Sequence, residues 1–177
     1  MIDQKCRLCP RECKAERENG QMGFCGMTGK GIRAARAALH FLGRTMYFRE
    51  GRFRCRLFLQ AVPCVVFTVR TARSQPGGWE RRSAFHAWWT SFFELKEQGA
   101  ENINLVTPSH YADKIMSAIR MAKERGFDLP FVYNCSGYEK VEVLKQLTGL
   151  IDIYLTDFKY MSPESALRYS HAKDYPK

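Results

Sequence analysis

Residues 103–133, INLVTPSHYADKIMSAIRMAKERGFDLPFVY, carry the clearest secondary-structure pattern in the chain. The apolar run 103–106 predicts a buried strand. Four apolar residues then recur at helical spacing: Ile115, Ala118, Ile119 and Ala122. This spacing predicts a helix over 111–125 that ends before Gly126. A second apolar run, 130–133, predicts another strand, so the stretch is a strand–helix–strand unit and implies two parallel strands.

The same alternation continues on both sides of this unit. A helix is predicted to end at Gly99, and the segment 139–147 predicts a further helix before a third strand over 151–155. Strands that alternate with helices through short loops predict an α/β fold with a parallel sheet. The carboxyl edge of such a sheet is the expected place for a functional site.

Polar residues follow each of the three predicted strands. They are Thr107, Ser109 and His110 after the first, Asn134 and Ser136 after the second, and Asp157 and Lys159 after the third. Because parallel strands end at one edge, these side chains are expected to share a cleft. Each also has a structural explanation, with Ser109 as a helix N-cap, 134–137 as turn residues and Lys159 in solvent. We expect Cys135 to be a small buried residue.

Four cysteines near the N-terminus are the strongest chemical signal in the translated chain. They are Cys6, Cys9, Cys13 and Cys25, on a short segment that contains Pro and Gly. Four thiolates on so little chain predict a closed metal or iron–sulfur site, with free thiols or disulfides as the alternative. We therefore predict a cysteine-rich metal module over 1–36. The spacing does not separate zinc from iron–sulfur.

The chain shows no secretory or membrane-spanning signal. No run approaches the roughly 18 apolar residues that a membrane helix needs, and the charged N-terminus leads into no apolar segment. A cytoplasmic location is therefore expected, where a reducing environment favours metal binding by clustered cysteines over disulfides.

The window 43–91 differs in composition from the rest of the chain. It contains nine Arg and two Glu with no Lys or Asp, so it carries +7 of the net charge of +10, and it holds all three Trp. The flanking residues balance 19 basic against 16 acidic side chains. We interpret the window as a stretch translated out of frame and not natively folded. The basic excess is accordingly not taken as a sign of nucleic-acid binding, although a basic zinc protein that contacts nucleic acid remains an alternative.

Codon arithmetic supports this interpretation. The codons for 60–71, read two bases late, can encode Gly-Cys-Thr-Leu-Arg-Cys-Val-Tyr-Cys-Gln-Asn, which contains Cys-x3-Cys-x2-Cys. Similar shifts over 44–58 and 79–92 yield a loop, a strand and a segment that leads into the helix at 93–97. Three single-base insertions in the coding DNA would produce these shifts of the reading frame.

Together with that motif, the flanking sequence resembles a family of radical S-adenosylmethionine (radical SAM) proteins related to pyruvate formate-lyase activating enzymes. The matching stretches are Cys6-Arg-Leu-Cys-Pro-Arg-Glu-Cys13, Gly23-Phe-Cys25-Gly, Ala37-Ala-Leu-His-Phe41, Gly99-Ala-Glu-Asn-Ile-Asn-Leu-Val-Thr-Pro108 and Asp152-Ile-Tyr-Leu-Thr-Asp-Phe-Lys159. The resemblance implies a partial parallel (β/α) barrel over 37–177, incomplete because the family's barrel continues for several more strands and helices.

The resemblance also implies a function and its cofactors. A 4Fe–4S cluster held by the cysteine triad would cleave S-adenosylmethionine reductively to a 5′-deoxyadenosyl radical. Four residues would hold that cofactor: Asn134, Ser136, Asp157 and Lys159. The N-terminal cysteines would hold a second cluster or a metal. Implied partners are an electron donor such as flavodoxin or ferredoxin and a protein substrate.

The translated chain departs from the family at its defining motif. Cys55 and Cys64 are the only cysteines in the window, and they do not form the triad. As translated, the chain is therefore expected to be inactive. The alternative is a degenerate fragment that retains only the N-terminal four-cysteine metal site.

Sequencing of the coding DNA between the codons for Ala38 and Leu95 tests the interpretation. We expect three extra single bases, whose removal restores Cys-x3-Cys-x2-Cys in frame. Coding DNA whose third codon positions cannot encode that triad in the shifted frame would contradict it.

Overall fold

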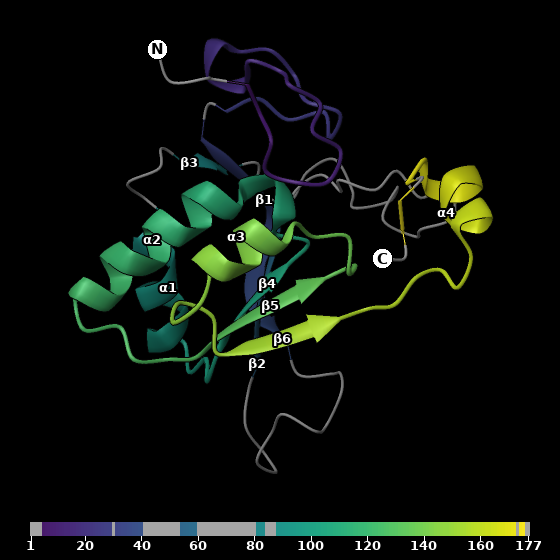
Figure 1. The fold of residues 1–177 in the computed structure, drawn as a ribbon. Coiled ribbons are helices and arrows are strands. Elements are labelled where there is room, and N and C mark those ends of the chain that lie inside the picture. Colours follow the sequence, from purple (N-terminus) through teal and green to yellow (C-terminus); the bar gives the residue numbers. More distant parts are fainter. Residues whose placement is uncertain are drawn as a thin grey trace.

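A computed structural model describes residues 5–29, 31–40, 54–59, 81–83, 88–172 and 174–175. Six strands form one sheet in the order β3-β1-β2-β4-β5-β6 (Figure 1). They are β1 (Ile32–His40), β2 (Arg54–Leu59), β3 (Arg81–Ser83), β4 (Ile103–Val106), β5 (Phe131–Cys135) and β6 (Ile153–Thr156). The helices are α1 (Trp88–Glu97), α2 (Ala112–Glu124), α3 (Val141–Gln146) and α4 (Pro163–Ser170), with 3-10 turns η1 (Arg17–Asn19) and η5 (Ser109–Tyr111).

The strands β2, β4, β5 and β6 run parallel to one another. Leu105 of β4 pairs with Tyr133 of β5, and Tyr133 pairs with Tyr154 of β6. Strand β1 instead pairs antiparallel with both β2 and β3. The predicted α/β fold with a parallel sheet is therefore confirmed. The six-stranded sheet also has an antiparallel part.

Helices α1, α2 and α3 pack on one face of the sheet around a shared apolar core. Ile103 and Leu105 alternate along β4, and each is fully buried in this core. The ring of Phe92 from α1 lies 5.2 Å from the ring of Phe131 and 5.9 Å from that of Phe127. Burial of these large apolar side chains drives the association of the helical layer with the sheet.

Local sequence signals explain where the helices stop and start. Gly99 follows α1 at φ 93° and Gly126 follows α2 at φ 81°, which are left-handed conformations that glycine adopts without steric cost. Helix α4 starts at Pro163, and the Ser162 hydroxyl accepts a hydrogen bond from the Ser165 N–H at 3.2 Å. Proline in the first turn after a serine N-cap is a common helix start.

Parts of the window 43–91 lie in described elements. They are β2, β3 and the first residues of α1, of which Trp88 is only 2% exposed. The stretch 60–71, which would encode the cysteine triad in the shifted frame, lies outside the described residues. The out-of-frame interpretation stays a prediction.

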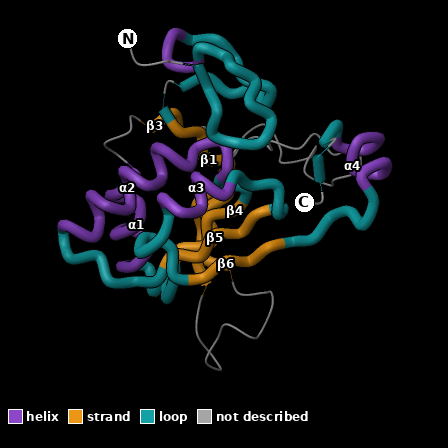
Figure 2. The backbone as a smooth tube through the Cα atoms, viewed as in Figure 1, coloured by secondary structure: helices purple, strands orange, loops and turns teal. Residues whose placement is uncertain are grey.

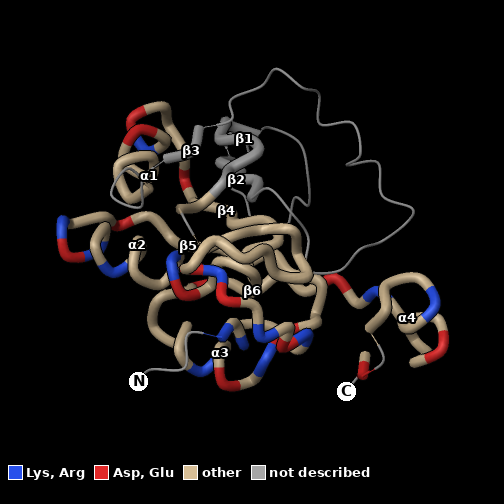
Figure 3. The backbone as a smooth tube through the Cα atoms, turned by 90° about the horizontal axis from the view of Figure 1, so that it is seen from above, with Lys and Arg blue, Asp and Glu red and all other residues tan. Residues whose placement is uncertain are grey.

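Charged residues of both signs are interspersed along α2, α3 and α4 (Figure 3). This distribution agrees with the balance of charges outside the window. Among the described helices, none has the length and apolar character required to cross a membrane.

Replacement of Phe92 tests the aromatic core. We expect Phe92→Ala to lower the free energy of unfolding by about 3–5 kcal/mol, because it leaves a cavity between α1 and β5. Urea denaturation measures this change. Met161→Ala is the matched control, since Met161 is 85% exposed, and a change of about 0.5 kcal/mol or less is expected. Equal effects of the two substitutions would contradict the assigned core.

Candidate functional site

The loops after β4, β5 and β6 are linked by backbone hydrogen bonds at the carboxyl edge of the sheet. The N–H of Thr107 donates to the carbonyl of Asn134 at 2.8 Å, and the N–H of Asp157 donates to the carbonyl of Cys135 at 2.9 Å. Gly137 lies in the same corner at φ 78°, where an added Cβ would come within 3.1 Å of Thr156. The edge is therefore a compact set of adjoining turns.

The four residues expected to hold the cofactor lie along this edge. Tyr175 links two of them, because its hydroxyl donates to the carbonyl of Ser136 at 3.1 Å and accepts from the N–H of Lys159 at 2.8 Å. The Lys159 ammonium forms a 2.9 Å ion pair with Asp157, and both side chains are about two-fifths exposed. Asn134 and Ser136 are half-buried. The structure thus brings the predicted residues to one side of the sheet, with Asp157 and Lys159 paired to each other.

A buried amide, that of Asn104, accompanies the half-buried Asn134. Ile103 and Leu105 face the helices, so strand alternation places Asn104 on the opposite face of β4. In the neighbouring strand, Asn134 shares that face. Asn104 is 1% exposed, and its Oδ1 atom has no hydrogen-bond partner within the part of the chain that the structure describes. A buried oxygen without a donor is costly, so this face suits a polar ligand that brings donors of its own.

The cysteine segment, residues 5–29, is mostly loop apart from η1 (Figure 2). Backbone hydrogen bonds fold it back on itself: the N–H of Cys6 donates to Ala15, and the N–H of Lys14 donates to the carbonyl of Cys6. A Cβ added to Gly23 would lie 3.4 Å from the Cys13 sulfur and 3.5 Å from the Cys25 sulfur. These two sulfurs therefore lie close to the same point beside Gly23, and none of the four cysteines forms a disulfide.

The thiols differ in their readiness to ionise. Burial raises the pKa of Cys9 to about 11, and the neighbouring Cys6 adds to the effect. Burial acts in the same direction on Cys13, but backbone hydrogen bonds at Ala15 and Phe24 outweigh it and the pKa of Cys13 is lowered. Among the described residues, no three Cys, His, Asp or Glu side chains are arranged as a ready set of metal ligands. Ligation would require the sulfurs to move together and Cys9 to lose its proton.

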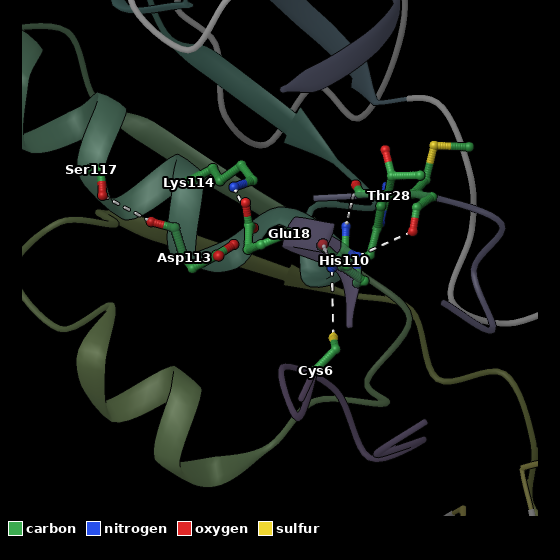
Figure 4. Close-up of polar contacts among 9 residues, drawn as sticks. Cys6, Glu18, Thr28, His110, Asp113, Lys114 and Ser117 are labelled. Carbon is green, nitrogen blue, oxygen red and sulfur yellow. Dashed lines mark hydrogen bonds and ion pairs between the residues drawn. The ribbon is translucent and has the colours of Figure 1, made fainter. Parts of the chain in front are cut away.

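The cysteine segment docks on the turns that follow β4 and β5. Arg17 donates from Nη1 to the carbonyl of His110 at 2.8 Å, and Glu18 forms a 2.9 Å ion pair with Lys114 (Figure 4). Glu12 forms a further ion pair with Lys140, which lowers the pKa of Glu12. The predicted module and the predicted cofactor residues are thus held at the same edge of the sheet.

Arg11 extends this docking to the last helix. Its guanidinium donates to the carbonyls of Ser170 and His171 at the end of α4. The same group lies 4.4 Å from the centre of the Phe24 ring and 5.3 Å from that of Tyr138. One side chain therefore connects the cysteine segment, the β5–α3 loop and α4.

Sequence reasoning missed a largely buried carboxyl group at the edge, that of Glu139, whose residue as a whole is half-buried. The Ser109 hydroxyl donates to its Oε1 atom at 2.5 Å, and the Tyr133 hydroxyl donates to Oε2 at 3.3 Å. The prediction that Ser109 caps a helix is therefore wrong, because its side chain bonds across to the next loop. No sequence spacing indicates this contact, which depends on the β4–β5 pairing.

Burial of Glu139 has a clear electrostatic consequence. It raises the pKa of this carboxyl group to about 7, against the lowering effect of the bonds from Ser109 and Tyr133. Burial, reinforced by Glu139, also raises the pKa of Cys135. Cys135 is 4% exposed, which confirms the prediction of a small buried residue.

Comparisons with known proteins identify one distant relative. The chain is 24% identical over 186 aligned positions to an uncharacterized protein of Methanocaldococcus jannaschii, and the match covers 98% of this chain and 51% of that protein. The chain thus spans about half the length of the curated relative it matches. No protein-family model matches the chain, and no solved structure matches it. The name of the relative states no activity.

The Glu139 carboxyl group predicts a pH-dependent stability. The folded protein holds this proton more tightly than the unfolded chain, whose glutamate pKa is about 4.5, so the free energy of unfolding falls as the pH rises from about 4.5 to about 7. We expect Glu139→Gln to flatten this dependence and to be more stable than the natural chain at pH 8, by on the order of 3 kcal/mol.

Urea denaturation at pH 5 and pH 8 measures the effect. Glu124→Gln removes an exposed carboxylate at the end of α2 and serves as the control. If the free energy of unfolding depended on pH in the same way in the natural chain and in Glu139→Gln, the raised pKa of the Glu139 carboxyl group would be refuted.

Proposed function

We propose that this protein is a radical S-adenosylmethionine enzyme related to the pyruvate formate-lyase activating enzymes. The observation that carries the proposal is the docking of the four-cysteine segment on the carboxyl edge of a parallel α/β sheet, through Arg17 and His110. Metal-binding thiols and a polar strand-end surface then occupy one side of the molecule. Active sites of parallel (β/α) folds lie at this edge.

The chain's own residues are assigned to cofactor binding. In this proposal Asn134 and Ser136 bind the polar groups of the methionine and ribose, and Asn104 offers an acceptor for a donor on the same ligand. The ion-paired Asp157 and Lys159 offer charges complementary to the amine and carboxylate of the methionine part. Zwitterionic groups are recognised by such paired charges at low cost in net charge.

The catalytic cluster does not fit the chain as translated. Three thiolates at the spacing Cys-x3-Cys-x2-Cys are required, and the sequence contains no such triad. When bound, a reduced 4Fe–4S cluster supplies the electron that cleaves the cofactor to methionine and a 5′-deoxyadenosyl radical. We therefore assign cofactor cleavage to the frame-restored protein, and metal and cofactor binding to the chain itself.

The second candidate is a degenerate fragment that binds metal at the N-terminal cysteines and does no chemistry. The missing triad is the observation that favours it. In that case the four thiols hold zinc or an iron–sulfur cluster for structural reasons, since a closed site with four protein ligands leaves no position for a substrate.

Metal content and cofactor cleavage test the proposal together. We expect the chain purified without oxygen to hold metal that is lost in the double variant Cys6→Ser, Cys9→Ser, because two of the four thiolates are removed. We expect the frame-restored protein, reconstituted with iron and sulfide and reduced with dithionite, to release 5′-deoxyadenosine from S-adenosylmethionine. Chromatography of the products measures this.

Cys135→Ser is the matched control for metal content, because Cys135 is a buried cysteine outside the segment. Metal binding without any cofactor cleavage by the restored protein would favour the degenerate fragment. Metal that survives the double substitution would contradict the four-cysteine site in both candidates.

A further inference from the structure

Arg17 is a buried cation in the middle of the cysteine segment. It is 5% exposed, and its guanidinium donates four hydrogen bonds. The acceptors are the carbonyls of His110, Met27 and Thr28, at 2.8, 3.2 and 3.3 Å, and the sulfur of Cys6, at 3.7 Å. A buried charge is costly unless an opposite charge lies near it. Three carbonyls orient the guanidinium without neutralising it.

The candidate counter-charges are the carboxylate of Asp113 in α2 and, within the same segment, the sulfur atoms of Cys6 and Cys25. Cys6 accepts directly from Nη1 of Arg17. The space beside Gly23 brings in two more thiols, because a Cβ there would lie 3.4 Å from Arg17 Cδ and from the Cys13 sulfur, and 3.5 Å from the Cys25 sulfur. The Arg17 side chain therefore lies near three of the four sulfurs, those of Cys6, Cys13 and Cys25.

A metal site with four thiolate ligands is negatively charged, so the position of Arg17 beside the sulfurs is electrostatically favourable. Four thiolates around a divalent zinc ion carry a net charge of about −2, and a site of that charge in a partly buried segment needs nearby positive charge. Arg17 is held rigidly by its carbonyl bonds. Hydrogen bonds from N–H groups to ligand sulfur also tune a metal site.

We propose that Arg17 is a positioning residue for the four-cysteine site, acting as the fixed counter-charge of the thiolates and tying Cys6 to the turn that carries His110. This inference rests on the proposed metal binding by the segment. Because Nη1 bonds both Cys6 and the His110 carbonyl, ligation of Cys6 is coupled to the β4–α2 turn. Metal binding therefore also rigidifies the carboxyl edge of the sheet at 110–114.

Anaerobic titration of the full chain with Co²⁺ tests the inference, since cobalt bound to thiolates is read from its charge-transfer absorption. We expect Arg17→Gln to weaken cobalt binding by about tenfold or more, a typical effect of altering the surroundings of metal ligands. Arg17→Lys retains the charge and is expected to recover most of the affinity. Hydrogen exchange of the amides at 110–114 should slow on metal binding in the natural chain and not in Arg17→Gln.

The matched control is Arg7→Gln, which removes the same charge from an exposed position on the same segment. Equal cobalt affinity in Arg17→Gln and Arg7→Gln overturns the role of Arg17 and leaves the metal site standing. Failure of the natural chain to bind cobalt overturns both. Circular dichroism shows whether Arg17→Gln folds. If it does not, Arg17→Lys is used instead, because this variant keeps the positive charge. A tenfold loss of cobalt affinity in folded Arg17→Lys would refute the role of Arg17 as the counter-charge.

Discussion

Parallel pairing of β4, β5 and β6 forces three strands to end at one edge, and the rest of the site depends on this constraint. At the strand ends, Val106 of β4 pairs with Asn134 of β5, and Cys135 of β5 pairs with Thr156 of β6. The turns that follow neighbouring strands therefore begin side by side. Backbone hydrogen bonds from Thr107 and Asp157 then link the turns across the strands. Thr107 and Asn134, and likewise Cys135 and Asp157, are more than twenty positions apart in the chain and become neighbours because the hydrogen-bonded ladder fixes the arrangement of the strand ends.

The cysteine segment depends on that edge because it has little core of its own. Loop segments of this size rarely bury enough apolar surface to fold alone and are commonly stabilised by metals or by docking. Here two arginines provide the docking: Arg17 binds the turn after β4, and Arg11 binds the end of α4 and stacks on Tyr138. Both use planar groups with several donors, which lysine does not offer. A metal among the thiols would add the remaining stabilisation.

The edge also holds polar groups in surroundings that are costly for them. Glu139 retains a proton up to about neutral pH because burial disfavours its charge, and on the nearby face of β4 the buried Oδ1 atom of Asn104 has no donor among the described residues. Elsewhere in the described chain, the face of β4 and β5 that meets the helices is apolar. Unfavourable polar burial of this kind occurs at binding sites, where a ligand can recover the cost, but it also occurs at the amino end of β4, where the Asn102 Oδ1 atom is buried without a partner among the described residues.

The sequence by itself predicted the strands and helices between residues 93 and 155, but not the start of α1 at Trp88 or the helix α4. The strand predicted over 103–106 is β4, and the helix predicted over 111–125 is α2 with small changes at its ends, because apolar periodicity and glycine stops are local signals. The positions of the strand-end residues followed from the parallel fold. Only the tertiary structure decided that Ser109 bonds Glu139 and that Arg17 joins Cys6 to His110, because these partners are 30, 11 and 93 positions apart. Contacts of that kind depend on how strands pair and segments dock, and no short-range pattern of residues encodes them.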